Sequence, residues 1–296
     1  MSGTSIECRV LQGFHRIPYA GFTSAHTNRR CENDPRMMMI GASIDGRPVG
    51  LAVMLRDEDD ESALLESIFV DPPYRGRGVG RRLLEAVEAT CFEESVKTLS
   101  GSWYDDAPSA ASVVGLIGRS GWSDPETVTS VHRGGRPLLE HADRTSRKWS
   151  CRPGFAIESW SELSAVDLEQ IERLKKTHGI SIGLHPEGES MLPVSASTSV
   201  VLRRGGEVVG WMVHHVLGSE TLRYSSLWLH PDLIGRGLGI AIAIESSRRH
   251  LAVVDRLPRL IFFVLRNNDA MHRFIARRMK PAIDRSSTLL RSERTF

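Results

Sequence analysis

Residues 71–80 of this chain read Asp-Pro-Pro-Tyr-Arg-Gly-Arg-Gly-Val-Gly, and residues 230–239 repeat the pattern as His-Pro-Asp-Leu-Ile-Gly-Arg-Gly-Leu-Gly. Each stretch follows an apolar run typical of a β-strand and precedes a run typical of an α-helix. A glycine-rich turn between strand and helix suits a phosphate group, because the backbone closes tightly around the anion while free N–H groups and the helix dipole point at it. The repeat therefore predicts two similar halves, each with a candidate phosphate-binding loop.

The similarity extends to both sides of the glycine-rich stretches. Each half is expected to contain a hairpin, a strand that ends at the glycine loop, a helix, then a further strand, helix and final strand. In the first half we expect these elements over 38–44, 48–55, 63–70, 80–90, 98–103, 108–120 and 127–132. In the second half we expect them over 199–204, 208–216, 222–229, 239–251, 260–265, 269–279 and 287–291. The pattern predicts an α/β (α+β) fold with a mixed, mostly antiparallel twisted sheet and helices on both faces, present twice in tandem.

The length and the loop-forming residues predict where the halves divide. A chain of 296 residues suits two domains, each large enough for its own core. The stretch around 134–154 is rich in Arg, Pro, Gly and Ser, which is typical of a linker. We expect an N-terminal domain over 1–135, a linker over 136–154 and a C-terminal domain over 155–296.

Composition argues against several classes of protein. The net charge of +2 gives no strong attraction to nucleic acid or to a membrane surface. The four cysteines form no Cys-x-x-Cys pair, which fits a reducing cytoplasm, and no run reaches the ~18 apolar residues of a membrane span. No His-Glu-x-x-His or comparable metal motif is present, so we expect no metal. A homodimer is compatible with the sequence, which does not fix the oligomeric state.

The order of hairpin, strand and Arg-x-x-Gly-x-Gly opening a helix resembles the GNAT superfamily of acyl-CoA-dependent N-acyltransferases. Residues 75–80 match the family signature at every position, and the strand before them and the helix after them match its context. With its second copy, the chain resembles the tandem two-domain type, similar in organisation to mycothiol synthase. The resemblance implies the GNAT fold in both halves and an N-acyltransferase, with acetyl as the expected acyl group.

The resemblance also implies which residues hold acetyl-CoA or another acyl-CoA as co-substrate. Backbone amides of the first loop would bind the pyrophosphate with arginines nearby, and the amide of Phe69 or Val70 would polarise the thioester carbonyl. The implied set is Phe69, Val70, Arg75, Gly76, Arg77, Gly78, Val79, Gly80 and Arg81. In the second loop Ile234 replaces the arginine, so we interpret this loop as degenerate: a structural relic or a weaker CoA site.

The candidate catalytic residues lie in the first half. A carboxylate on the strand before the loop often serves as the general base in this family, and Glu66 holds that place. Alternation along the strand predicts that Glu66 and Val70 share one face. The equivalent residue of the second half is Ser225, which cannot act as a base, and this favours catalysis in the first half. A solvated strand glutamate without a catalytic role is the alternative.

The sequence indicates the general acid less clearly than the general base. The family often places a tyrosine in the helix that follows the next strand, but Ile117 and Phe274 stand there in the two halves. Tyr104, at the end of the strand opposite Glu66, is a candidate substitute, with a structural tyrosine as the alternative. His214 and His215 are adjacent on one strand and must point to opposite faces, so we expect core or hydrogen-bonding roles rather than a metal pair.

The acceptor is expected to be a small-molecule amine. In the family, the segment before the first hairpin caps the acceptor site. Here it carries a mixed cationic and aromatic set that would suit an acceptor with a carboxylate or phosphate as well as an amine: His15, Arg16, Tyr19, His26, Asn28, Arg29 and Arg30. An ordinary amphipathic surface is the alternative. Two other functions stay open: an acyl-CoA-binding or regulatory module without turnover, and catalysis in the C-terminal half.

Overall fold

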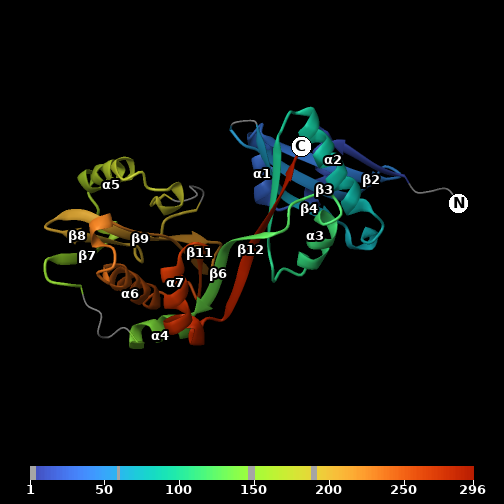
Figure 1. The fold of residues 1–296 in the computed structure, drawn as a ribbon. Coiled ribbons are helices and arrows are strands. Elements are labelled where there is room, and N and C mark those ends of the chain that lie inside the picture. The colour runs from blue at the N-terminus through green and yellow to red at the C-terminus, as the bar shows by residue number, and fades with distance from the viewer. Residues whose placement is uncertain (1–4, 59–60, 146–150, 188–191) are drawn as a thin grey trace. The chain divides into compact units, whose positions relative to one another are not determined.

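The computed structural model describes residues 5–58, 61–145, 151–187 and 192–296. These residues form two compact units (Figure 1). The N-terminal unit contains the chain up to Val128 together with Thr288–Phe296, and the C-terminal unit is Thr129–Ser287. No helix among the described residues is long and apolar enough to cross a membrane.

The N-terminal unit is a mixed sheet with helices on both faces. Its strands are β1 (Ile6–Val10), β2 (Met37–Ile44), β3 (Arg47–Arg56), β4 (Ser62–Val70), β5 (Thr98–Tyr104) and β12 (Arg285–Thr295), in that order across the sheet. Its helices are η1 (Gly13–Phe22), α1 (Ala25–Asn33), η2 (Pro72–Tyr74), α2 (Val79–Glu93) and α3 (Ala110–Ile117). The neighbouring strands pair antiparallel except β4 and β5, which are parallel.

Two apolar clusters fix the faces of this sheet. The larger one packs α2 and α3 against one face, with Leu83 and Leu84 of α2 fully buried. The smaller one packs η1 and α1 against the other face around Tyr19 and Cys31. We call the second face the α1 face.

The C-terminal unit repeats this arrangement. Its strands are β7 (Phe155–Ser159), β8 (Val200–Arg204), β9 (Glu207–Leu217), β10 (Thr221–Leu229), β11 (Arg259–Leu265) and β6 (Glu126–Gly135), in that order. Its helices are α4 (Arg136–Thr145), η3 (Trp160–Glu162), α5 (Ala165–Thr177), η4 (Ile182–Leu184), η5 (Pro231–Leu233), α6 (Leu238–Leu251), α7 (Asp269–Phe274), the π-turn η6 (Ile275–Met279) and η7 (Lys280–Ala282). Separate apolar clusters pack α5 on one face and α4 and α6 on the other. The mostly antiparallel sheet with helices, present twice, confirms the predicted fold class.

The final strands are exchanged relative to the sequence-based expectation. We expected 127–132 to close the first half and 287–291 to close the second. Instead β6 pairs antiparallel with β11 in the C-terminal unit, from Thr129↔Leu265 to Gly135↔Arg259. Strand β12 pairs antiparallel with β5 in the N-terminal unit, from Leu289↔Tyr104 to Thr295↔Thr98. Local alternation predicts that a strand forms, but its partner depends on contacts far away in the sequence.

The expected linker also contains structure. Residues 136–145 form α4, which buries Leu138 and Leu139 against Val254 and Leu260. Pro137 favoured a linker in our sequence interpretation, yet proline fits the first turn of a helix, where its missing N–H is not needed. Residues 146–150 of the expected linker lie outside the described residues.

Candidate active site

Strand β4 separates from its parallel neighbour β5 half-way along its length. Parallel pairs join Ser62–Leu65 to Thr98–Gly101, and among the described residues none follows. The remaining residues of β4, Glu66–Val70, are all half-buried although β4 lies inside the sheet. One backbone edge of this segment is therefore available to a ligand.

A β-bulge lies at the point where the strands separate. Val53 pairs with Ser67 and Met54 pairs with Leu65, so Glu66 has no partner on β3. The extra residue changes which face the following side chains occupy. The side chain of Glu66 reaches Arg30 of α1, whereas Val70 packs in the cluster of α2 on the opposite face. The prediction that alternation places Glu66 and Val70 on one face is therefore wrong.

The hydrogen bonding of β4 distinguishes the two candidate amides. The N–H of Asp71 donates to the carbonyl of Val49 on β3 at 2.9 Å. Because N–H groups alternate between the two edges of a strand, the N–H of Phe69 also faces β3 and that of Val70 faces the open edge. The carbonyl of Val70 accepts from Nε of Arg75 at 3.0 Å, which links this edge to the glycine loop.

The first glycine loop has the backbone that an anion site needs. Gly76 and Gly78 have φ of +74° and +86°, values that a side chain would strain, and a Cβ at either would meet no atom within 4 Å. Gly78 is the N-cap of α2. Within the described chain, no backbone hydrogen bond occupies the N–H groups from Gly76 to Arg81. A phosphate group fits this arrangement of free donors at a helix N-terminus.

Arginine side chains surround the same loop. Arg75 lies over the ring of Phe69 and Arg77 over the ring of Tyr74, with guanidinium carbons 5.7 and 5.6 Å from the ring centroids. Arg81 and Arg82 are exposed and share the carboxylate of Glu85 one turn further along α2. The arginine ion pairs hold the pKa of the Glu85 carboxyl below its usual value. The loop is therefore strongly cationic.

The second glycine loop keeps the backbone but not the charge. Gly235 and Gly237 have φ of +81° and +80°, and Gly237 is the N-cap of α6. Ile234, in the place of Arg75, is 68% exposed, and Arg236 is the cation that remains between 234 and 241. The difference between the loops therefore lies in side-chain charge and not in conformation.

The face beside the strand also differs between the units. In the C-terminal unit the bulge falls at Ser225, the position equivalent to Glu66. The indole of Trp211 and the hydroxyl of Ser226 both donate to the carbonyl of Leu184 in η4, at 3.0 and 2.7 Å. Ser226 and Trp228 are only 2% and 8% exposed, so η4 and the tryptophans cover this face of β10. In the N-terminal unit the α1 face of β4 stays half-exposed.

Tyr104 ends the strand that diverges from β4. It pairs with Leu289 of β12 and is half-buried. Its neighbour Trp103 packs in the cluster of α2 and α3, so alternation directs Tyr104 to the α1 face, where Glu66 also points. Asp105 accepts the N–H of Thr288 at 2.7 Å and stabilises the strand end. The structure thus places both candidate catalytic residues on one face.

The segment before the first hairpin contributes one cation to β4. Arg16 donates to the carbonyls of Leu11 and Cys31, and Asn28 to that of Ala20, so these side chains stabilise the segment itself. Tyr19 is a core residue, 2% exposed. Arg30 reaches the carboxylate of Glu66, 2.6 Å between Nη1 and Oε1. His15, His26 and Arg29 are exposed.

A buried polar network lies in the C-terminal unit. The hydroxyl of Ser246 donates to the carbonyl of Thr198, so it accepts from Nε2 of His214, and Nδ1 of His214 lies 3.1 Å from the hydroxyl oxygen of Thr198. The imidazole stacks on Tyr224, with ring centroids 3.7 Å apart. Tyr224 in turn bonds His250 at 3.0 Å. Burial keeps the pKa of His214 well below its ordinary value, so this ring is neutral, as expected of a core histidine.

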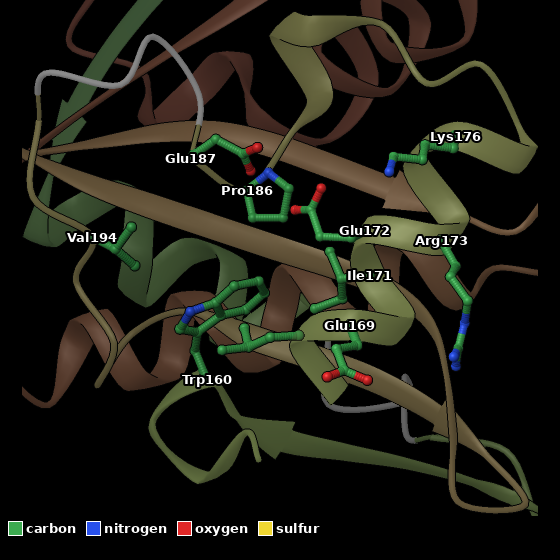
Figure 2. A pocket seen from close by; sticks show the side chains of 10 residues that line it. Trp160, Glu169, Ile171, Glu172, Arg173, Lys176, Pro186, Glu187 and Val194 are labelled. Carbon is green, nitrogen blue, oxygen red and sulfur yellow. The ribbon is translucent and has the colours of Figure 1, made fainter. Parts of the chain in front are cut away.

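A groove of about 820 Å³ lies elsewhere in this unit (Figure 2). It is lined by Trp160, Leu168, Glu169, Ile171, Glu172, Arg173, Lys176, Pro186, Glu187 and Val194. Buried Lys175 bonds both Glu172 and Glu187 and so ties α5 to the following loop. These lining residues come from η3, α5 and the segment after η4, and none belongs to the glycine loop or to β10.

No cluster of three or more His, Cys, Asp or Glu side chains in the part of the chain that the structure describes could hold a metal ion. The donors present are instead backbone amides and guanidinium groups, which suit a phosphorylated co-substrate.

Comparison with known proteins identifies the fold and the N-terminal unit. Residues 9–111 match the sequence model of the Acetyltransferase (GNAT) family. The N-terminal unit is a GNAT acetyltransferase domain. A stretch of 85 residues is 36% identical to the mycothiol acetyltransferase of Clavibacter michiganensis and spans 29% of this chain and 26% of that relative. The chain thus matches about a quarter of the length of this curated relative.

Solved structures show that the tandem organisation covers the chain. A tandem GNAT protein from the clavulanic acid biosynthesis pathway is similar over 98% of both chains, with a TM-score of 0.70 and 12% identity. A GCN5-related N-acetyltransferase from Sphaerobacter thermophilus is similar over 97% of this chain and 95% of its own, with a TM-score of 0.60 and 14% identity. At this identity the likeness concerns the fold. The predicted resemblance to tandem GNAT proteins is confirmed.

Proposed function

We propose that the N-terminal unit transfers an acyl group, acetyl in the first instance, from acyl-CoA to the amine of a small molecule in one direct step. The observation that carries the proposal is that one unit combines an open edge of β4, a cationic glycine loop and a carboxylate at the bulge. The C-terminal unit repeats the loop backbone but lacks that carboxylate, most of the charge and the open face.

The residues of the loop would hold the CoA pyrophosphate. The amides of Arg77, Gly78, Val79 and Gly80 point outward at the start of α2, where the helix dipole favours an anion. Arg75 and Arg81 add charge, and the side-chain-free Gly76 lets the phosphates approach the backbone. The amide of Val70 would polarise the thioester carbonyl, with the ring of Phe69 beside it under Arg75.

The chemistry needs a base for the amine and a proton for the thiolate. Glu66 would take a proton from the ammonium group, and the freed nitrogen would attack the thioester carbon. The new C–N bond forms and the C–S bond breaks; the nitrogen releases its second proton to solvent, and CoA leaves as a thiolate that is protonated to the thiol. Tyr104 is the candidate donor of that proton, since it lies on the same face of the sheet. A thiolate is a good leaving group, so this donor contributes less than the base.

A turnover assay with matched glycine variants tests the proposal. Acetyl-CoA is offered with a panel of small amines, and thiol release and CoA binding are measured in parallel. We expect release with some amines, and its loss together with CoA binding in Gly78→Val. Gly237→Val is the matched control, because Gly237 has a similar φ, +80° against +86° for Gly78, and is likewise the N-cap of its helix.

Two results would contradict the proposal in different ways. CoA binding without release for any amine would support an acyl-CoA-binding or regulatory module instead. Loss of turnover in Gly237→Val, with Gly78→Val active, would place catalysis in the C-terminal half.

A further inference from the structure

The ion pair between Arg30 and Glu66 leaves polar atoms of both side chains unused. Its single contact joins Nη1 of Arg30 to Oε1 of Glu66 at 2.6 Å. Within the described residues, Nε and Nη2 of Arg30 and Oε2 of Glu66 make no hydrogen bond. The side chains are 31% and 16% exposed, so the pair is open to a ligand on one side.

The pair lies where an acceptor must approach. Glu66 is the bulge residue of β4, at the end of the paired part of β4 and β5. Val70, whose amide faces the open edge, follows four residues later on the same strand. Arg30 is the arginine of α1 that reaches this strand, whereas Arg16 of η1 is bound to the carbonyls of Leu11 and Cys31.

We propose that the acceptor is an amino acid or a similar small zwitterion, which inserts into this pair. Its ammonium group would lie against Glu66 and its carboxylate against the free Nε and Nη2 edge of Arg30. Four charges of alternating sign then meet at one half-buried place, and the planar guanidinium matches a carboxylate with two parallel hydrogen bonds. In an α-amino acid a single carbon separates the two ionic groups, which suits two receptor groups already in contact. This inference rests on the proposed function, since it names the acceptor of the same site.

Binding of the zwitterion would also prepare the base. In the free protein Arg30 and Glu66 neutralise each other. Once the acceptor carboxylate balances Arg30, Glu66 can take the proton of the ammonium group without leaving the guanidinium unpaired. The nitrogen lone pair then attacks the thioester carbon and the C–N bond forms. The nitrogen releases its second proton to solvent, and the C–S bond breaks with its electron pair leaving on sulfur. An amine without a neighbouring carboxylate would neither pair with Arg30 nor free Glu66 to take the proton.

Matched acceptors and an arginine series test this assignment. Initial rates with acetyl-CoA are compared for amino acids, their decarboxylated amines, their amides and their aminophosphonate analogues, in wild type, Arg30→Met and Arg30→Lys. We expect wild type to favour the carboxylated acceptors. Arg30→Met should lower kcat/KM for these by roughly 30-fold, the loss of one charge-assisted pair, and by less than about threefold for the decarboxylated amines. For Arg30→Lys, kcat/KM for the carboxylated acceptors should lie between the values of wild type and Arg30→Met. Arg9→Met, at an exposed arginine of β1, is the control and should leave kcat/KM for both kinds of acceptor unchanged.

Three outcomes would overturn the inference. An equal fall for both kinds of acceptor in Arg30→Met would mean that Arg30 acts on Glu66 alone. If wild type does not prefer the carboxylated acceptors, the proposal of a zwitterionic acceptor is wrong. If wild type prefers the aminophosphonate, the acceptor carries a phosphate-like group instead of a carboxylate. Calorimetric titration of the same amino acids without acetyl-CoA separates this inference from the proposed function. Binding to wild type that Arg30→Met abolishes would support the zwitterion site even if no acceptor is turned over.

Discussion

Lowering the pH below about 6.5 should weaken the C-terminal unit and spare the N-terminal unit. His214 is fully buried with both ring nitrogens bonded, and His250 donates Nε2–H to the carbonyl of Leu257 while Nδ1 accepts from the hydroxyl of Tyr224. Burial lowers the pKa of both imidazoles, that of His214 strongly. Below pH ~6.5 the folded unit therefore binds fewer protons than the unfolded chain does. Stability is fully present above the unfolded pKa of ~6.5 and is lost as the pH falls toward the folded values.

The size of the effect follows from linkage. Each histidine that stays neutral in the folded state removes about 1.4 kcal/mol of unfolding free energy per pH unit below ~6.5. His214 supplies this slope, and His250, whose pKa burial also lowers, adds to it in the same direction. Since a domain is typically stable by only about 5–15 kcal/mol, a fall to pH 5.5 removes a measurable part of the stability of this unit.

Hydrogen exchange followed by mass spectrometry measures the two units separately. Opening free energies are compared for β9 and β10 and for β3 and β4 at pH 7.5, 6.5 and 5.5, after correction for intrinsic exchange. The N-terminal unit is the internal control, because its two histidines, His15 and His26, are exposed. His214→Gln should reduce the slope in the C-terminal unit by about 1.4 kcal/mol per pH unit, whatever its effect at neutral pH. Equal slopes in the two units, or an unchanged slope in His214→Gln, would refute the reasoning.

Three further predictions concern the site and the division of the chain. Glu66→Gln keeps the size and the contact to Arg30 but removes the base, so kcat should fall roughly 10²-fold with CoA affinity unchanged, and a fall below about threefold would place the base elsewhere. Calorimetry should give one CoA per chain in wild type and in Gly237→Val, and two equivalent sites would show that the second loop binds as well as the first. Leu138→Ala should destabilise the C-terminal unit by about 2–5 kcal/mol, because Leu138 is 2% exposed in its core, and unchanged unfolding would mean that α4 acts only as a linker.

The glycine loops and their elements could be predicted from the sequence, because every signal involved is local. Glycine marks the positions of positive φ, and alternation and helical spacing mark the strand and helix on either side. Even α6, in which Ile240, Ile242 and Ile244 alternate as in a strand, is a helix, as the repeat predicts for 239–251. The exchange of β6 and β12 could not be predicted, since it depends on pairing between residues more than a hundred positions apart.

The bulge of β4 was missed although the sequence carries a signal for it. Two adjacent polar residues interrupt the strand in each half, Glu66-Ser67 and Ser225-Ser226, and strict alternation would send one of each pair into the core. An extra residue lies at that point in both units; Glu66 and Ser67 stay half-buried, whereas Ser226 is 2% exposed and donates its hydroxyl hydrogen to the carbonyl of Leu184. The bulge decides that Glu66 meets Arg30, so the candidate base and its partner could be named from the sequence but not brought together.

The two glycine loops have the same backbone conformation although their side chains differ, which indicates how the two halves of such a repeat can diverge. The positive φ of Gly78 and Gly237 is set by the entry into α2 and α6, and each helix packs into the core of its unit. Loss of that turn would destabilise the unit, so the glycines are retained whether or not a phosphate binds. The surrounding charges and the face of the strand carry no such structural constraint and can change freely. A glycine loop of this type is therefore evidence of the fold, whereas the open face with Glu66 and Arg30 is the observation that supports our proposal of catalysis in the N-terminal unit.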